Sequence, residues 1–310
     1  MVDVSIIIVS WNARAYLVKC LESLRSQRSV HPTETIVVDN ASADGSADAV
    51  EKQFPEVRVI RNEANLGFAR ANNLGIQRAQ ARYFALVNSD IEVLDDCIDR
   101  MVAYMGGHPR VGVLGPRILN PDDTLQESCQ RFPKLWRALA QALGIHRLLP
   151  SVAYCSHART GRVEALTGCF LMARREALEQ VGGLDERFFM YGEDLDWCKR
   201  FDDAGWEAAY YTGAEVIHHG GRSSANAPVR FYLEMQRANR QYYLKHHGME
   251  AAHVYRYILI LHQVLRVLRA LLLLPLDRKG SRGMSHKLER SFACLCFLLT
   301  LREGQGAGAA

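Results

Sequence analysis

The sequence lacks several features that mark common classes of protein. Its eight cysteines form no Cys-x-x-Cys pair, so the patterns of a zinc ribbon and of a thioredoxin-like redox site are both missing. Most of these cysteines have apolar neighbours, and we expect reduced thiols in a cytosolic compartment. No run of about 18 uncharged apolar residues is present, so a membrane-spanning helix is not expected. The apolar run at residues 4–9 is too short for a secretory signal and lacks a preceding basic segment.

Composition and net charge say little about a partner. The 310 residues are 48% hydrophobic and 23% charged, which is typical of a globular protein and excludes a disordered or collagen-like chain. The formal net charge is only +4, and no nucleic-acid partner is expected. From Arg256 onward, however, nine basic residues stand against three acidic ones, so positive charge gathers in the last part of the chain.

Short apolar runs alternate with amphipathic helices through about residue 120. Strands are expected at 4–12, at the start of 34–46, and at 57–61, 84–90 and 111–115. This alternation predicts an α/β fold with a mostly parallel sheet and helices on both of its faces. The continuously apolar strands fit burial on both sides. Ligands of such sheets bind beyond the carboxyl ends of the strands, so the polar residues there are the first candidates for chemistry.

The second half of the chain is less regular. Residues 121–162 contain three prolines around one expected helix near 135–143, and we interpret them as a lid-like segment. From residue 163 the pattern predicts a strand, a helix to Val181, a loop, a helix over 194–204 and a strand over 206–211. Residues 254–272 predict a helix with one apolar arc and basic residues off that arc.

Three candidate sites follow strands in the first half of the chain. Asp39 could accept a hydrogen bond from a nucleobase or could cap a turn with Ser42. Gly67 begins a helix that carries Arg70 in its first turn, which is an arrangement that binds anions or simply starts a helix. Asp90, in the run Asn88-Ser89-Asp90, could bind a divalent cation shared with phosphates, or could form a turn. No Gly-x-Gly-x-x-Gly follows the first strand, which disfavours a dinucleotide cofactor.

Two more candidates lie in the second half. Glu193 and Asp194 open a helix among aromatic residues, where a carboxylate could act as a general base or could cap the helix. His218 and His219 follow a strand, and one of them could bind a metal or both could be structural.

Seven blocks carry a more specific signal: VSIIIVSWN, VVDNASADGS, NLGFARANN, NSD, LTGCFLMARREAL, GGLDERFFMYGEDLDWCKR and VIHHGGRSS. In order and spacing they resemble the family-two inverting glycosyltransferases, especially the bacterial rhamnosyltransferase-like branch. The resemblance covers residues 4–248 and implies a GT-A fold. It divides the chain into a catalytic domain at 1–248, with a nucleotide-sugar-binding half at 1–120 and an acceptor half at 121–248, and a helical tail at 249–310.

The resemblance also implies roles for individual residues. Asp194 matches the catalytic base, and Asp90 with His218 matches the site of a divalent metal, Mn²⁺ or Mg²⁺. Asn88 stands at the first position of the family's DXD motif, as in many members of this branch, which leaves one carboxylate of that motif at the metal. The residues implied to bind the nucleotide sugar are Ser10, Asn12, Asp39, Gly67, Arg70 and Asn88. Those implied to bind the acceptor are Gly168, Glu193 and Trp197.

The implied reaction is a single displacement that moves one sugar from a nucleotide-sugar donor to a hydroxyl of a glycan or lipid-linked acceptor. The leading donor is dTDP-rhamnose. Residues 236–240 lack the Gln-x-x-Arg-Trp pattern of processive relatives, so addition of one sugar is favoured. Three alternatives stay open: a transferase using a UDP-hexose, a non-catalytic nucleotide-sugar-binding scaffold, and a nucleotidyltransferase, although the phosphate loop of the last is missing.

The apolar arc of the tail predicts one of two arrangements. It could lie on the inner face of the plasma membrane, since basic amphipathic helices bind at the membrane interface. It could equally pack on the catalytic domain. The first arrangement would suit a lipid-linked acceptor, and it predicts a cytoplasmic, peripheral membrane protein.

Overall fold

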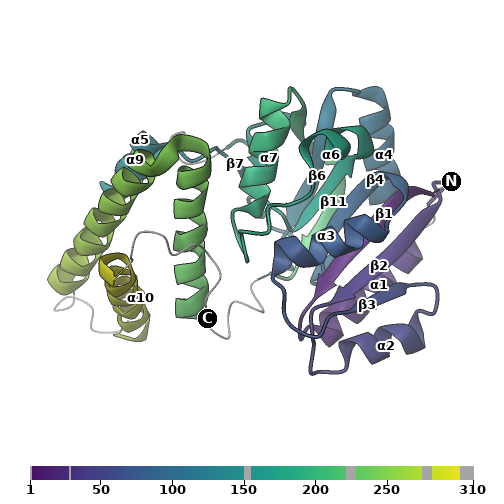
Figure 1. Ribbon diagram of the computed structural model, residues 1–310, viewed down its shortest axis with the longest axis horizontal. Helices are drawn as coiled ribbons and strands as arrows, with labels where there is room; N and C mark the ends of the chain where they lie inside the picture. Colours follow the sequence, from purple (N-terminus) through teal and green to yellow (C-terminus); the bar gives the residue numbers. More distant parts are fainter. Residues whose placement is uncertain (1, 28, 150–154, 221–227, 274–280, 301–310) are drawn as a thin grey trace. The chain divides into compact units, whose positions relative to one another are not determined.

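A computed structural model describes residues 2–27, 29–149, 155–220, 228–273 and 281–300 (Figure 1). The chain forms two compact units. This division differs from the expected boundary at residue 248, because the helix before that residue belongs with the tail. The first unit comprises Met1–Phe132, Cys155–Phe189 and Glu193–Ala225, and the second comprises Pro133–Tyr154, Met190–Gly192 and Asn226–Ala310.

The first unit contains a nine-stranded sheet in the order β3-β2-β1-β4-β10-β6-β11-β5, with β8 paired to β11. Its strands are β1 (Val2–Ser10), β2 (Thr33–Asp39), β3 (Arg58–Arg61), β4 (Ala81–Asn88), β5 (Ile91–Val93), β6 (Val111–Leu119), β8 (Gly161–Val163), β10 (Phe170–Arg174) and β11 (Glu207–His218). A second, two-stranded sheet joins β7 (Cys129–Gln130) and β9 (Ala165–Leu166). The described residues of this unit form the helices α1 (Arg14–Ser26), α2 (Ser46–Gln53), α3 (Phe68–Arg78), α4 (Cys97–Gly107), α6 (Arg175–Val181) and α7 (Glu193–Asp203).

Helices cover both faces of the sheet, as predicted. On one face, Ile6 and Ile8 of β1 belong to a buried core that α1, α2 and α4 complete. On the other face, Ile7 lies against α3. Gly75 allows this approach, because a Cβ there would lie 2.4 Å from Cγ2 of Ile7. Successive residues of β1 therefore face opposite helical layers, which explains why its sequence is continuously apolar.

The strands β3, β2, β1 and β4 are parallel, and β10 enters the sheet antiparallel to β4. The pairing of Phe170 with Val87 sets the register between the last two. The residues that precede β10 consequently lie beside the carboxyl end of β4. The antiparallel strand β10 thus brings a segment from the second half of the chain to the edge of the sheet where β1, β2 and β4 end.

The second unit is helical. It contains α5 (Leu135–Ala142), the short 3₁₀ helix η1 (Ile145–Arg147), α9 (Pro228–Leu273) and α10 (Ser281–Thr300). Gly248, with φ of 85°, breaks α9 into two helices. Their packing places the rings of Tyr243 and Tyr255 4.5 Å apart, and the Gln263 amide donates a hydrogen bond to the Tyr232 hydroxyl at 2.8 Å.

The segment expected to be lid-like contributes to this second unit. Leu135 and Ala138 of α5 pack on the core formed by α9 and α10, to which Leu259 and Cys294 also belong. Because α5 contributes apolar side chains to that core, its packing is part of what stabilises the unit.

Candidate active site

The carboxyl ends of β1, β2 and β4 place three predicted residues side by side. Ser10 pairs with Asp39 across the sheet, and Val9 pairs with Asn88. Both Ser10 and Asp39 are buried, and Ser10 Oγ and Asp39 Oδ1 have no hydrogen-bond partner among the described residues. Asp39 Oδ2 accepts a bond from the Ser42 N–H at 3.1 Å, so the turn expected as an alternative also forms. A buried, unpaired polar atom is costly, which suits these atoms to hold a ligand.

Asn12 braces the loops that border these atoms. Its N–H donates to Ser42 Oγ at 2.9 Å, and its side-chain oxygen accepts from the Ala43 N–H at 2.8 Å. The residue has a φ of 51°, a conformation that asparagine tolerates better than most residues. Its side chain is thereby engaged within the protein, and it holds the turn whose Ser42 N–H bonds to Asp39.

Gly67 and Arg70 lie at the start of α3. The Phe68 N–H donates to the Phe189 carbonyl at 2.8 Å, and a Cβ on Gly67 would lie 2.6 Å from that same oxygen. Only glycine therefore fits this close crossing, at a φ of 83°. The Arg70 side chain is 58% exposed and lies 3.9 Å from Glu186, a weak pairing that leaves its guanidinium accessible to an anion.

Asp90 and His218 meet where β4 ends and β11 ends. His218 Nε2 lies 3.2 Å from Asp90 Oδ1, and the His219 N–H donates to the Asp90 carbonyl at 3.0 Å. His219 instead lies 3.3 Å from Glu92 and packs on Tyr16. Of the two histidines, His218 is therefore the one that faces the predicted metal carboxylate.

These two groups fit a divalent cation that is shared with a ligand. In the described part of the chain no cluster of three or more His, Cys, Asp or Glu side chains could hold a metal. Mg²⁺-type cations, however, commonly take one or two carboxylates and complete their coordination with substrate phosphates and water. The 3.2 Å separation of Nε2 and Oδ1 is also close to the roughly 3 Å expected between adjacent ligands with bonds of 2.0–2.1 Å.

The carboxylates at the start of α7 are buried. Asp194 Oδ2 accepts a bond from the Gly168 N–H at 2.9 Å, and Oδ1 accepts one from the Leu195 N–H at 2.8 Å. Glu193 Oε2 is buried without a partner among the described residues. Burial, with the negative charges of Asp194 and Asp196, holds the pKa of Glu193 well above its usual range. Glu193 thus favours the neutral form beside Asp194.

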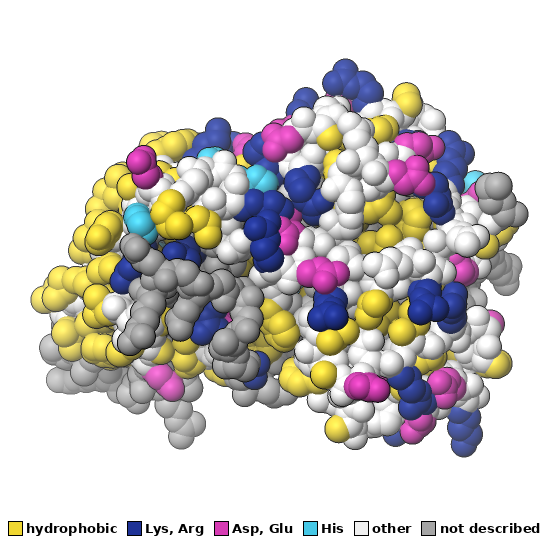
Figure 2. Space-filling view, viewed as in Figure 1, with side chains coloured by type: hydrophobic (Ala, Val, Ile, Leu, Met, Phe, Trp, Pro, Cys, Tyr) yellow, Lys and Arg dark blue, Asp and Glu magenta, His cyan; other side chains and the backbone are white. Residues whose placement is uncertain are grey.

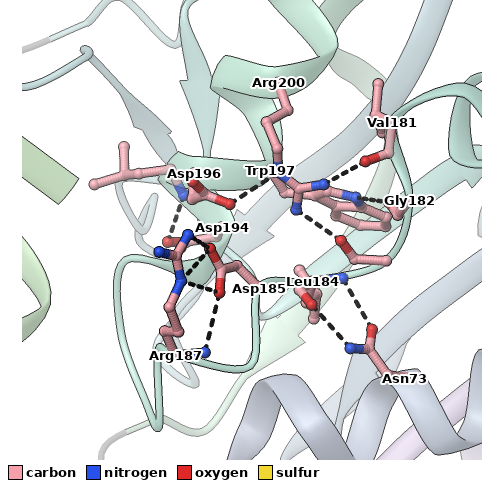
Figure 3. Close-up of polar contacts among 12 residues, drawn as sticks. Asn73, Val181, Gly182, Leu184, Asp185, Arg187, Asp194, Asp196, Trp197 and Arg200 are labelled. Atoms are coloured by element: carbon pink, nitrogen blue, oxygen red, sulfur yellow. Dashed lines mark hydrogen bonds and ion pairs between the residues drawn. The ribbon is translucent and has the colours of Figure 1, made fainter. Parts of the chain in front are cut away.

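The loop before α7 is held by residues that the sequence did not single out. Arg200 pairs with Asp196 at 2.9 Å and donates to the carbonyls of Val181 and Gly183 (Figure 3). From the other side, the Asn73 side chain exchanges two hydrogen bonds with the backbone of Leu184 (Figure 3). The sequence signal for Arg200 was its position four residues after Asp196 on one helix, a spacing that favours an ion pair. The sequence does not show which loop Arg200 holds.

Trp197 requires a correction. Its side chain is fully buried, and its indole N–H donates to the Gly182 carbonyl at 3.0 Å (Figure 3). A side chain with no exposed surface cannot contact an acceptor in this structure, so Trp197 packs α7 against the loop instead. The aromatic residue was correctly expected near the acidic cluster, but helical periodicity turns it to the inside.

Gly168 and Cys169 connect the two ends of the site. Gly168 bonds to Asp194, and the Cys169 carbonyl accepts a bond from the Asn88 N–H at 2.9 Å. Burial and the negative charges of Asp90 and Asp194 raise the pKa of the Cys169 thiol to about 12. The two hydrogen bonds of Gly168 and Cys169 connect the start of α7 to the end of β4, the strand that precedes Asp90.

Comparison with known proteins gives a consistent result. Residues 5–182 match the family model described as glycosyl transferase family 2, and residues 151–220 match that of an N-terminal domain of galactosyltransferase. An N-acetylglucosaminyl-diphospho-decaprenol L-rhamnosyltransferase of Mycobacterium tuberculosis is 33% identical over 252 residues, which cover 74% of this chain and 80% of that protein.

Solved structures share the fold at low sequence identity. A mannosyltransferase from Pyrobaculum calidifontis, solved with GDP-Man and Mn²⁺, has a TM-score of 0.57 at 16% identity and covers 96% of this chain and 87% of its own. GalNAc-T7, solved with UDP, GalNAc and Mn²⁺, has a TM-score of 0.54 at 16% identity, and the match covers 70% of this chain and 44% of that one.

Proposed function

The chain belongs to glycosyltransferase family 2 and is a glycosyltransferase with the GT-A fold, and from this premise we propose that it moves one L-rhamnose from dTDP-rhamnose to a hydroxyl group of a lipid-linked glycan. The observation that carries the proposal is the placement of the buried Asp194 carboxylate, through Gly168 and Cys169, beside the strand end that bears Asp90. The M. tuberculosis relative, named for rhamnosyl transfer to a diphospho-decaprenol-linked sugar, supports the choice of donor and acceptor.

Asp194 is the general base in this proposal. Its two backbone N–H bonds, one on each oxygen, hold the carboxylate in place. The carboxylate takes the proton of the acceptor hydroxyl as that oxygen attacks the anomeric carbon. The sugar–phosphate bond breaks on the opposite face, and the nucleoside diphosphate leaves with the bonding electrons. One displacement inverts the anomeric configuration, so no covalent nucleophile on the protein is needed.

The donor is bound at the edge formed by β1, β2 and β4. The free, buried oxygens of Ser10 and Asp39 suit the N–H and O–H groups of a nucleoside. Asp90 and His218 would hold Mn²⁺ or Mg²⁺, which neutralises charge on the departing diphosphate when bound. Arg70 and the start of α3 add positive potential, and the side chain of Asn88 borders the same edge.

The acceptor binds around Gly168 and Glu193. Gly168 lets the backbone approach Asp194 closely, because a Cβ at this position would lie only 3.2 Å from the Asp194 Cβ. Glu193 in its neutral form can donate a hydrogen bond to an acceptor oxygen while Asp194 remains the base. Addition of a single sugar follows from the missing Gln-x-x-Arg-Trp pattern at residues 236–240.

A second part of the proposal places the enzyme on the cytoplasmic face of a membrane. No helix in the described ranges is both long and apolar enough to cross a bilayer. Within the second unit, however, Figure 2 shows apolar side chains gathered over its helices. On α9 the exposed apolar side chains include much of the predicted arc: Val254, Tyr257, Leu261, Val264 and Leu268. The segment of α5 and η1, from Trp136 to Leu148, adds five more: Trp136, Leu139, Leu143, Ile145 and Leu148.

Basic residues accompany this surface. Arg269 is exposed, and Arg256 and Arg266 are partly exposed on the same helix. Apolar side chains with neighbouring arginines are suited to bind an anionic bilayer surface. Each basic residue near such a surface contributes about 1 kcal/mol to the free energy of binding. All eight cysteines are free thiols, which agrees with a reducing compartment.

The membrane part is tested by substitution rather than by truncation. Removing the chain beyond Gly248 would strip Tyr255 and Leu259 from the core that they share with Tyr243, so a truncated protein would lose stability for reasons unrelated to lipid. The double variant L261Q/L268Q keeps that core. It should sediment with phosphatidylglycerol vesicles at least several-fold less than wild type, whereas the exposed-residue control Q77L should bind normally. Unchanged sedimentation of L261Q/L268Q would contradict membrane binding.

The catalytic part is tested with a donor screen. The enzyme, Mn²⁺ and a short-chain polyprenyl-diphospho-GlcNAc are incubated in turn with dTDP-rhamnose, UDP-glucose and UDP-GlcNAc, and products are separated and their anomeric configuration read by NMR. We expect an inverted rhamnosyl product from dTDP-rhamnose. Preferred transfer from a UDP sugar would support the UDP-hexose alternative. Nucleotide binding without transfer or hydrolysis of any donor would support a scaffold.

A further inference from the structure

A rigid turn follows β6 and carries a side chain to His218. The sequence Asn120-Pro121-Asp122-Asp123-Thr124 closes the turn with a bond from the Asn120 N–H to the Thr124 carbonyl at 2.8 Å. Proline sets the backbone for the first central position, and Asp123 takes the left-handed conformation, with φ of 61°, that completes such turns. The Gln126 N–H then donates to the Ile118 carbonyl at 2.9 Å, so the backbone of Gln126 is fixed.

Side chains from this turn form an unbroken hydrogen-bonded series that ends at the predicted metal site. The Thr124 hydroxyl donates to Asp122 Oδ1 at 2.6 Å, and Asn120 Nδ2 donates to Thr124 Oγ1 at 2.9 Å. Gln126 Nε2 donates to Asn120 Oδ1 at 2.9 Å. Gln126 Oε1 then lies 2.6 Å from His218 Nδ1.

The direction of every bond in this series is set by Asp122. Its bonds from Thr124 lower the pKa of the carboxyl below its ordinary value, so the group is an anion and can only accept. The Thr124 hydroxyl therefore donates its hydrogen bond to Asp122 and accepts one from the Asn120 amide NH₂ group. The Asn120 carbonyl then faces Gln126, whose own carbonyl is left to face His218. An amide carbonyl only accepts, so His218 Nδ1 must carry the proton.

We propose that Gln126 is a positioning residue that fixes His218 in the Nδ1–H tautomer and so turns the lone pair of Nε2 toward Asp90. The proposal rests on the proposed role of Asp90 and His218 in metal binding. A neutral imidazole binds a metal only through an unprotonated nitrogen, and a hydrogen bond on the other nitrogen sets which one is free. Gly220 closes one side of the bond, since a Cβ there would lie 3.4 Å from His218 Nδ1.

The first experiment measures Mn²⁺ binding directly. Q126L removes the acceptor at nearly constant volume, whereas Q126E retains an oxygen that accepts from Nδ1. Titration calorimetry of Mn²⁺ into each protein in the presence of dTDP should show binding about 10- to 100-fold weaker in Q126L, as for other residues that hold a metal ligand. Q126E should bind within a few-fold of wild type. The control Q77L changes an exposed glutamine on α3 and should not differ from wild type.

The second experiment reads the tautomer without metal or nucleotide. Protein labelled with ¹⁵N-histidine is recorded at about pH 8.5, well above the ordinary imidazole pKa, and the His218 signals are assigned by their loss in H218N. Wild type should show a protonated Nδ1, and Q126L should shift toward the Nε2–H form. An unchanged tautomer in Q126L, or a wild-type protonated Nε2, would overturn the proposal. A protonated Nδ1 in a protein that binds no Mn²⁺ would instead count against the proposed metal site.

Discussion

Replacing Asp194 with asparagine tests the assignment of the base, and the structure shows that this substitution does more than remove a charge. The Asp194 carboxylate accepts one backbone N–H on each oxygen, from Gly168 on Oδ2 and from Leu195 on Oδ1. Asparagine offers one oxygen and one NH₂ group, so in D194N one of these N–H groups faces a donor. The group left unpaired lies in a site where Asp194 itself is only 8% exposed.

The two consequences differ in size and can be measured separately. An unsatisfied buried N–H costs roughly 1–3 kcal/mol, which a domain with a stability of about 5–15 kcal/mol tolerates. Loss of a general base lowers the rate of the chemical step by about 10² to 10⁴. We therefore expect D194N to fold, to bind dTDP-rhamnose with near-normal affinity, and to transfer rhamnose at least about 10²-fold more slowly.

The assay follows product formation at saturating donor, with donor affinity and thermal unfolding measured on the same preparation. D203N is the matched control, because Asp203 lies at the other end of α7, is exposed and, among the described residues, pairs with Lys199 alone. D203N should retain wild-type turnover. If D194N transfers rhamnose at a near wild-type rate while remaining folded, Asp194 is not the base and the proposed mechanism is wrong.

Three further predictions concern the neighbouring groups. D90A should bind Mn²⁺ with dTDP at least about 10-fold more weakly by calorimetry, and chelator should abolish transfer until Mn²⁺ or Mg²⁺ is returned; full activity in chelator would exclude a metal role. G67A should lose more stability than G182A in chemical denaturation, because both require positive φ but only Gly67 has a Cβ clash, 2.6 Å from the Phe189 carbonyl; equal losses would contradict this. The free energy of unfolding of E193Q should increase relative to that of wild type as pH rises above about 4.5, by up to about 1.4 kcal/mol per pH unit. The reason is that Glu193 ionises in the unfolded wild-type protein, whereas burial keeps it protonated in the folded one. A difference in stability that does not grow with pH would contradict the raised pKa.

The parallel strands at the proposed nucleotide site were predictable because their signal is local. A continuously apolar run that ends in a polar residue identifies both a buried parallel strand and its carboxyl end, so the pattern alone places Asp39 and Asn88 at one edge of the sheet, whereas Ser10 was singled out by the family resemblance. The direction of β10 was not predictable in the same way. Its first four residues are apolar whichever way the strand runs, and only pairing with β4, far away in the sequence, sets Cys169 beside Asn88.

The tail shows a different limit of sequence patterns. The apolar arc through Val254, Tyr257 and Leu261 was expected to be buried somewhere, yet within its unit these side chains are exposed. The buried face carries Tyr255, Leu259 and Gln263, because the first half of α9 and α10 pack there. A helix with apolar residues on two faces gives no local indication of which face has a partner, and the helix of residues 228–247 that supplies this partner was not predicted.

Gly168 and Cys169 fix the distance between the proposed base, Asp194, and the end of β4, where we propose that the donor binds. Asp194 is held by the Gly168 N–H, and the carbonyl of Cys169 accepts the N–H of Asn88 at the end of β4. The separation between the proposed base and the proposed phosphate-binding end of the site is thus set by bonds to the main chain rather than by rotamers of long side chains. Productive transfer requires reacting atoms placed to within a fraction of an ångström, and backbone held in a sheet meets that requirement at a smaller entropic cost. A methyl group on Gly168, 3.2 Å from the Asp194 Cβ, would disturb this spacing while leaving every charged group in place.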